Sequence, residues 1–262
     1  MTQAKGWTTP FLHQFASLAG LLALLVFSGA SALWRVGGAR TTPQLTLWAW
    51  ERPEDLRFLG SDNVGVAYLA GSVYLEQEPV VHPRLQPLRV GEHTPVTAVV
   101  RLEPTKSTPT VFSDEYRTRL AEQIVRLSTA PQASSLQIDL DATRSQHDFY
   151  RALIGDVRRR LPASMPLSIT ALGSWCMGDD WMGGLPIAEA VPMLFRMGAD
   201  RADILQSLAL GEDFREPLCR GSVGVSTDEP WPALLLRRHV YVFHPRAWTA
   251  ESFAAVQRRL EP

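Results

Sequence analysis

The stretch Leu136-Gln137-Ile138-Asp139-Leu140-Asp141 alternates apolar and polar residues. Because successive side chains of a β-strand point to opposite faces, this alternation predicts a strand with one apolar face and one face that carries an amide and two carboxylates. The apolar face suits a layer of covering helices. Buried carboxylates are costly without partners, so the polar face predicts an enclosed polar space such as the lumen of a small barrel.

Seven other short β-like runs accompany this one, and several are separated by segments with helical spacing. The eight predicted strands are Leu45–Trp50, Gly65–Ala70, Val96–Leu102, Leu136–Asp141, Leu167–Leu172, Val191–Phe195, Val223–Ser226 and Val240–Phe243. The predicted helices are Asp114–Leu127, Gln146–Leu161, Ala202–Leu210 and Ala250–Leu260.

Strand alternating with helix favours parallel pairing, and eight such units predict an α/β fold, a small and irregular (β/α)8 TIM-like barrel. The proline-rich stretch from Glu76 to Pro95 predicts an extended excursion or hairpin in place of a helix. A doubly wound open sheet is the competing topology. No Gly-x-Gly-x-x-Gly motif follows a strand and no phosphate-binding loop is present, so nothing favours the nucleotide-binding form of that sheet.

An apolar segment without charged residues, Phe15 to Leu33, precedes the predicted barrel as an N-terminal hydrophobic helix. Residues 1–34 are therefore predicted to be a signal peptide or membrane anchor, residues 35–44 a linker, and residues 45–262 the barrel domain. Small residues at Ala30-Ser31-Ala32 fit a cleavage site, whereas the segment is also long enough to span a bilayer uncleaved. Both alternatives predict a periplasmic or extracellular protein, held at the inner membrane by residues 15–33 if the segment is retained. A buried core helix is a third, less favoured interpretation.

Charge and cysteine content narrow the predicted partners. The net charge is −1 and the basic residues are scattered, so nucleic acid is not an expected partner. In an oxidising compartment the two cysteines, Cys176 and Cys219, are candidates for a disulfide, and two buried thiols are the alternative. No zinc-binding or Gly-x-Ser-x-Gly motif occurs, and no cofactor or metal is predicted, although a divalent ion held only by carboxylates stays an open alternative.

The same alternation points Arg101 and Glu103 of the third strand, and Ser226 and Asp228 of the seventh, into the lumen. Arg101 is thereby expected to pair with Asp139. Catalytic residues of such barrels lie at the carboxyl ends of the strands. The acidic residues expected near this rim are Glu51, Glu103, Asp141, Asp228 and Glu229.

Carboxylates beside tryptophans at such a rim are typical of a carbohydrate site, in which one carboxyl group protonates the leaving oxygen and another attacks or activates water. The interpretation makes Asp141 the general acid or nucleophile, Asp228 or Glu229 its partner, and Asp139 with Arg101 a charge-tuning pair. The predicted binding residues are Trp50, Glu51, Arg101, Glu103 and Trp175, and about two of Trp48, Trp50, Trp175 and Trp231 are expected to contact ligand.

The same residues also have purely structural interpretations. Arg101 and Asp139 fit a purely structural ion pair, which is the favoured reading of the two. Asp228 and Glu229 fit a turn or helix cap, Glu51 fits a cap of the first helix, and the tryptophans fit a core.

Several stretches resemble a bacterial family known as domain of unknown function family 3142. They are residues 47–56 (LWAWERPEDL), 137–142 (QIDLDA), 168–172 (SITAL), 174–176 (SWC), 190–198 (AVPMLFRMG), 226–229 (STDE) and 241–245 (YVFHP). The resemblance implies a glycosidase-like barrel and carries no catalytic assignment.

The fourth strand is also similar to the chitinase signature, in which alternating aspartates lead to a catalytic glutamate two positions after the last of them. Thr143 occupies that position here, so the general acid of that mechanism is absent. Two hypotheses follow: a glycoside-hydrolase-like barrel outside the cytoplasm that acts on or binds an envelope polysaccharide, or a non-catalytic envelope binding or scaffold protein.

Overall fold

The computed structural model describes residues 44–60, 63–109, 111–129, 133–233 and 238–261, all within the compact unit that runs from Thr41 to Pro262. The predicted signal peptide or anchor and nearly all of the predicted linker lie outside the described residues. Within the described ranges, no helix combines the length and the apolar character needed to cross a membrane.

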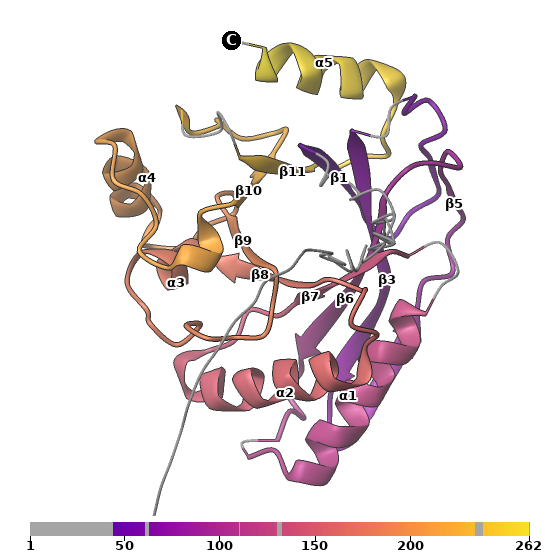
Figure 1. Cartoon of the computed structure of the whole chain (residues 1–262), viewed down its shortest axis with the longest axis vertical. Coiled ribbons are helices and arrows are strands. Elements are labelled where there is room, and N and C mark those ends of the chain that lie inside the picture. The colour runs from indigo at the N-terminus through magenta and orange to yellow at the C-terminus, as the bar shows by residue number, and fades with distance from the viewer. Residues whose placement is uncertain (1–43, 61–62, 110, 130–132, 234–237, 262) are drawn as a thin grey trace, which may run out of the picture. The chain divides into compact units, whose positions relative to one another are not determined.

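Eight parallel strands close into a barrel (Figure 1). They are β1 (Leu45–Ala49), β3 (Val64–Leu75), β6 (Val96–Pro104), β7 (Ser135–Asp139), β8 (Leu167–Leu172), β9 (Glu189–Met193), β10 (Ser222–Ser226) and β11 (His239–Phe243). Each pairs with the next in this order, and β1 closes the ring by pairing with both β3 and β11. All eight predicted strands are present, and the predicted barrel is confirmed.

The helices cover the outside of the barrel. They are α1 (Asp114–Ser128), α2 (His147–Arg160), α3 (Gly173–Met177), α4 (Arg201–Ala209) and α5 (Ala250–Leu260), with 3-10 turns η1 (Arg144–Gln146) and η2 (Pro217–Cys219). Figure 1 shows α1 and α2 packed side by side and α5 at the opposite end of the view. Their ends follow local sequence: the Ser113 hydroxyl accepts from Tyr116 N to start α1, and Thr249 forms a capping box with Ser252 at α5. The four predicted helices are confirmed, and α3 is an addition.

The barrel is irregular where the sequence predicted an excursion. β4 (Pro79–Pro83) pairs antiparallel with the second half of β3, and β5 (Leu88–Arg89) pairs with β2 (Glu54–Asp55) in a small separate sheet. The predicted extended hairpin is confirmed. After β1 the chain enters β2 and not a helix, so the reading of Glu51 as a helix cap is wrong.

Alternation along the strands divides the core into two layers. Val96, Ala98 and Val100 belong to the cluster between strands and helices, whereas Val99 belongs to a lumen cluster with Trp48. The Trp48 ring fills the middle of the lumen: a Cβ on Gly224 would lie 2.8 Å from its Cη2 atom, and its Nε1 donates to Gln137 Oε1 at 3.0 Å. Trp48 thus forms a floor, and the open space lies above it at the carboxyl ends of the strands.

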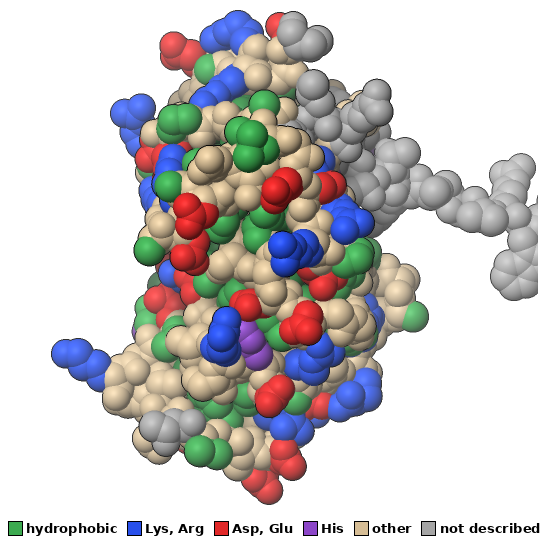
Figure 2. Space-filling view, turned by 90° about the vertical axis from the view of Figure 1, so that its left-hand side faces the viewer, with side chains coloured by type: hydrophobic (Ala, Val, Ile, Leu, Met, Phe, Trp, Pro, Cys, Tyr) green, Lys and Arg blue, Asp and Glu red, His purple; other side chains and the backbone are tan. Residues whose placement is uncertain are grey.

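The outer surface carries mixed charge. Figure 2 shows acidic and basic side chains interspersed over the face that it presents, among hydrophobic and neutral groups. This part of the described surface has no patch of a single sign.

Candidate functional site

A cavity of about 600 Å³ opens at the carboxyl ends of the barrel strands. Its lining comes from the ends of β1, β6, β7, β8, β9 and β11 and from the segments that follow β8 and β9, where barrel enzymes place their sites. We call it the mouth cavity. The polar and aromatic side chains in its lining are Trp48, Trp50, Arg52, Arg101, Asp139, Asp141, Thr170, Ser174, Phe195, Arg196, Asp200 and Phe243.

Aromatic rings form one wall of the mouth cavity. Phe195 and Phe243 are stacked with centroids 5.7 Å apart, and Trp50 meets the Phe243 ring edge-on at 6.2 Å. Trp48 lies beneath them, 5.9 Å from Phe195. Trp50 remains partly exposed, so its ring presents apolar surface to the cavity.

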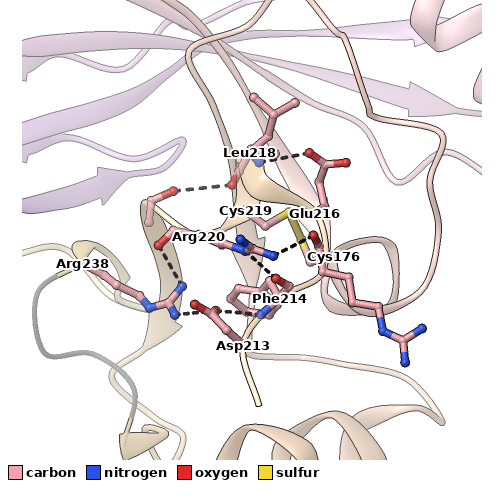
Figure 3. Close-up of a disulfide and its surroundings, with 11 residues drawn as sticks. Cys176, Asp213, Phe214, Glu216, Leu218, Cys219, Arg220 and Arg238 are labelled. Carbon is pink, nitrogen blue, oxygen red and sulfur yellow. Dashed lines mark hydrogen bonds and ion pairs between the residues drawn. A yellow bond between two sulfur atoms is a disulfide. The ribbon is translucent and has the colours of Figure 1, made fainter. Parts of the chain in front are cut away.

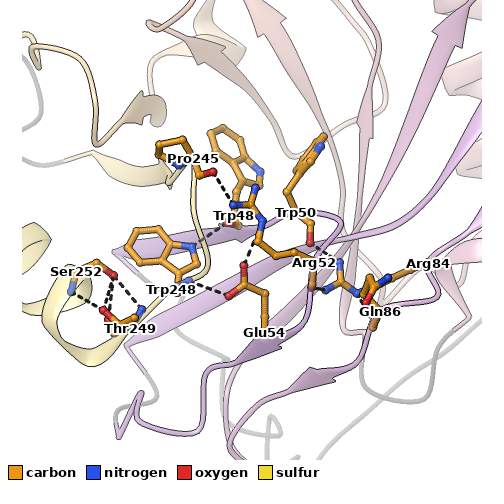
Figure 4. Close-up of polar contacts among 10 residues, drawn as sticks. All are labelled: Trp48, Trp50, Arg52, Glu54, Arg84, Gln86, Pro245, Trp248, Thr249 and Ser252. Carbon is orange, nitrogen blue, oxygen red and sulfur yellow. Dashed lines mark hydrogen bonds and ion pairs between the residues drawn. The ribbon is translucent and has the colours of Figure 1, made fainter.

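Arg84 fixes the segment that carries Trp50. Its guanidinium donates from Nη1 to the Trp50 carbonyl at 2.6 Å, from Nη2 to the Arg52 carbonyl at 2.5 Å and from Nε to the Gln86 carbonyl at 2.9 Å (Figure 4). Burial lowers the pKa of Arg84, and the negative charge of Glu54 opposes that effect. The proline-rich excursion therefore supplies a brace that orients the end of β1.

A second brace joins β1 to the chain after β11. The Glu54 carboxylate is buried, accepts from Trp248 N at 2.9 Å and lies 3.8 Å from Arg52 Nε. Arg52 Nη1 donates to the Pro245 carbonyl at 2.6 Å, and Trp248 Nε1 donates to the Trp48 carbonyl at 2.9 Å (Figure 4). Burial raises the pKa of Glu54, and the Trp248 hydrogen bond acts against the rise. These contacts hold Arg52 and both tryptophans of β1 in place.

Asp139 lies in the wall of the mouth cavity, almost fully buried. Thr170 Oγ1 donates to its Oδ1 at 2.7 Å, and Arg101 Nη1 lies 3.6 Å from its Oδ2. Burial raises the pKa of Asp139, and the Thr170 hydrogen bond and the Arg101 charge act against this rise. The predicted ion pair of Arg101 with Asp139 is confirmed; Arg101 also lies 3.4 Å from Glu103 Oε1 and 5.8 Å from the Trp50 ring centroid.

Two exposed carboxylates complete the acidic lining. Asp141 faces the mouth cavity from the segment after β7, as the alternation predicted. Asp200 enters from the loop before α4, and sequence reasoning missed it, because no strand alternation applies in that loop. In the structure its side chain makes no capping hydrogen bond.

The other predicted acidic residues do not line the mouth cavity. Glu51 is exposed beyond β1, and Glu103 accepts from Ser72 Oγ at 3.1 Å. Asp228 accepts from the Ser226 hydroxyl, while Glu229 accepts from Arg196 N at 2.9 Å and forms an ion pair with Arg201. Glu103 lies within β6 beside Arg101, and the turn after β10 directs the carboxylates of Asp228 and Glu229 to local partners, so the expectation that these residues line the cavity is corrected.

Two of the four candidate tryptophans also lie elsewhere. Trp175 is buried between α3 and its neighbours, with ring centroids 5.7 Å from His147 and 5.1 Å from Trp181. Trp231 donates from Nε1 to the Ser226 carbonyl at 2.7 Å and stacks with Arg259. Neither lines the mouth cavity, so the expected contact of Trp175 with a ligand there is corrected.

A disulfide ties α3 to the segment before β10. Cys176 and Cys219 are bonded with Cα atoms 5.9 Å apart, and the Cys176 carbonyl accepts from Arg215 N at 2.9 Å (Figure 3). Nearby, Arg220 Nε donates to the Phe214 carbonyl at 2.7 Å. Ser174 in the same short helix lines the mouth cavity, so the disulfide supports one wall of it.

Metal chemistry finds no support within the described ranges of the chain, where no group of three or more His, Cys, Asp and Glu side chains is placed to hold an ion.

Comparison with protein-family models and with curated protein sequences gives no match. Solved structures do match. A Streptomyces coelicolor protein described as a chitinase A superposes with a TM-score of 0.54 at 12% identity, over 82% of this chain and 95% of that one. The Bacillus cereus spore cortex-lytic enzyme SleL (TM-score 0.42, 11% identity, 71% of this chain and 51% of that one) and concanavalin B (0.42, 10%, 77% and 93%) are more distant. The first match supports the (β/α)8 barrel fold of this chain.

Proposed function

We propose that the protein binds a glycan in the mouth cavity. The observation that carries this proposal is the union, in one cavity, of an aromatic wall built from Trp50, Phe195 and Phe243 with the carboxylate of Asp141. Sugar rings have flat apolar faces that pack on aromatic rings, and their hydroxyl groups donate to carboxylates. A largely apolar cleft with a few polar groups is the usual form of a small-ligand site.

The surrounding residues have positioning roles in this proposal. Arg84 and Glu54 hold the segment with Trp50 and Arg52 from outside the cavity. Arg101 contacts both the Asp139 carboxylate and the Trp50 ring, so it fixes the position of the acidic side of the cavity relative to the aromatic side. A ligand thus meets side chains that are already held in place, which lowers the entropic cost of binding.

Binding is favoured over hydrolysis because the second carboxylate is missing where it was expected. Thr143, in the place of the chitinase glutamate, is exposed and forms a capping box with Gln146. The Asp228 carboxylate accepts a hydrogen bond from Ser226, and the Glu229 carboxylate forms an ion pair with Arg201.

Hydrolysis is kept as a second candidate on one observation. Burial raises the pKa of Asp139, and Asp141 lies exposed in the same cavity. A carboxyl group with a raised pKa close to a second carboxyl group is the pairing that glycosidases use for acid and nucleophile.

The ligand class we propose is an envelope polysaccharide met outside the cytoplasm. The disulfide of Cys176 with Cys219 supports this location, since such bonds persist in oxidising compartments. The apolar segment of residues 15–33 is proposed as the export signal or anchor. Membership of family 3142 stays a prediction.

Binding is tested by calorimetry against a panel of polysaccharides with Trp50→Ala and Asp141→Asn. Each substitution removes a group that contacts the ligand, so we expect an affinity loss of about tenfold or more. Trp231→Ala is the matched control, because this tryptophan lies outside the mouth cavity. Equal affinity in the Trp50 variant and the wild type would refute the proposal.

Hydrolysis is tested by product analysis from pH 3 to 9 on any polysaccharide that binds. Activity that disappears in both Asp139→Asn and Asp141→Asn would establish the second candidate. Absence of product at every pH, with binding intact, would eliminate it and leave the binding function.

A further inference from the structure

Three arginines line the mouth cavity, and two of them have carboxylate partners. Arg52 pairs with Glu54, and its Nη1 donates to the Pro245 carbonyl. Arg101 lies 3.4 Å from Glu103 and 3.6 Å from Asp139. The guanidinium groups of Arg52 and Arg101 therefore already have partners within the protein.

Arg196 differs from both. Its guanidinium lies over the Phe243 ring, 4.8 Å from the centroid, and among the described residues it has no carboxylate within ion-pair distance. The residue is exposed and lines the cavity. Phe243 belongs to the aromatic wall, so this cation lies directly beside the surface proposed to receive a sugar ring.

The backbone at Arg196 is built to hold this position. Its φ angle is +49°, in the left-handed region, and it is the one residue other than glycine with a positive φ in the described ranges. Residues other than glycine that are held in this region store backbone strain and gather at ligand sites. Glu229 maintains the conformation by accepting from Arg196 N at 2.9 Å and pairing with Arg201.

We propose that the ligand is an acidic polysaccharide and that the Arg196 guanidinium binds the carboxylate of a hexuronic acid unit. This inference rests on the proposed glycan binding. A guanidinium presents a planar fork of donors that matches a carboxylate in two parallel hydrogen bonds. The Arg196 guanidinium lies over the Phe243 ring on an exposed residue and has no carboxylate partner among the described residues, so its donors are available for these bonds. A uronate ring packed on the aromatic wall places its carboxylate beside this edge.

The other charged groups in the mouth cavity make the preference for an acidic ligand depend on the contact with Arg196. Asp141 and Asp200 also line the cavity, and Asp228 lies near enough to sense the charge of Arg196. These carboxylates repel an anionic sugar. The preference for an acidic ligand must therefore come from Arg196 itself and not from the net charge of the cavity.

The test measures binding of polygalacturonate, alginate and glucuronoxylan, each beside its carboxyl-reduced neutral form and beside a sulfated glycan of equal charge density. We expect the wild type to favour at least one uronate polymer over its reduced form by at least about tenfold. Arg196→Gln should bring the affinity for that polymer down to the affinity of the reduced form. Arg196→Lys, which keeps the charge without the fork, should fall between the two.

The matched control is Arg258→Gln on the exposed face of α5, which changes net charge equally and should leave both affinities unchanged. Equal binding of acidic and reduced forms by the wild type would overturn the inference and leave glycan binding standing. A preference that survives Arg196→Gln, or a preference for the sulfated glycan over every uronate, would also overturn it. Failure of every glycan, acidic, neutral or sulfated, to bind would refute both proposals. Thermal unfolding of each variant shows whether a loss of binding reflects a loss of fold.

Discussion

The carboxyl ends of β7 and β10 both carry a pair of acidic residues, and the two pairs have opposite environments. Asp139 at the end of β7 is buried in the wall of the mouth cavity, and burial raises its pKa. Asp228, just beyond β10, is exposed, and the hydrogen bond from Ser226 lowers its pKa. Asp141 faces the cavity, whereas Glu229 turns to Arg201.

The difference comes from where each residue stands relative to the end of its strand. Asp139 is the last residue of β7, so the alternation of the sheet alone directs its side chain into the lumen. Asp228 and Glu229 follow the last residue of β10 in a turn, where Glu229 N donates to the Ser226 carbonyl. In that turn local hydrogen bonds, and not the sheet, decide where the carboxylates point.

The largest effect is expected from breaking the disulfide between α3, which follows β8, and η2, which precedes β10. Replacing Cys176 and Cys219 together by serine should lower the free energy of unfolding by about 2–5 kcal/mol, because the bond closes a long loop between α3 and η2. Urea unfolding under oxidising conditions measures this loss. Reductant should weaken the wild type to the level of the double variant and leave the variant unchanged. Equal stability of the two proteins would contradict this role.

A smaller loss of stability is expected from removing the hydrogen bonds to Asp139 and Asp228, and the two losses should differ. Thr170→Val removes the donor to buried Asp139 and should cost about 1–3 kcal/mol, since the largely buried carboxylate loses a hydrogen bond. Ser226→Ala removes the donor to exposed Asp228 and should cost under about 1 kcal/mol, because solvent takes over. Urea unfolding of both variants at neutral pH compares them. Equal costs would show that the two sites do not differ in burial as described.

The fold could be predicted closely because its strands and helices follow periodicity. The alternation in residues 136–141 and in Val96–Leu102 sorted the lumen from the outer layer correctly, including the approach of Arg101 to Asp139. Trp48 and Trp50, two of the four tryptophans named as candidates for ligand contact, line the cavity.

The candidate site was predictable only as far as the strands reach. Trp175 lies in α3, a single turn of helix that the pattern did not predict, and its burial follows from that turn. Asp200 and Arg196 line the cavity from the loop between β9 and α4, and no alternation applies there. Arg84 reaches the end of β1 from the proline-rich excursion, a contact between segments that sequence spacing does not encode.

A third prediction uses the raised pKa of Asp139. A carboxyl group whose folded pKa lies above its unfolded value near 3.8 contributes stability at low pH that is lost as pH rises through the folded pKa. Asp139→Asn avoids this loss, so we expect it to be more stable than the wild type at pH 7, by on the order of 1 kcal/mol. The advantage should shrink as urea unfolding is repeated from pH 7 to pH 4. Lower stability of the variant at neutral pH would mean that Arg101 outweighs burial.

The smallest effect, with the opposite sign, is expected at Asp228. Its folded pKa is lowered, so its carboxylate contributes stability that is present above the unfolded value near 3.8 and lost as pH falls through the folded pKa. Asp228→Asn should therefore be less stable than the wild type at pH 7, by under about 1 kcal/mol since the group is exposed, and the two proteins should converge in acid. If both asparagine variants changed stability in the same direction with pH, the contrast between the ends of β7 and β10 would not be electrostatic.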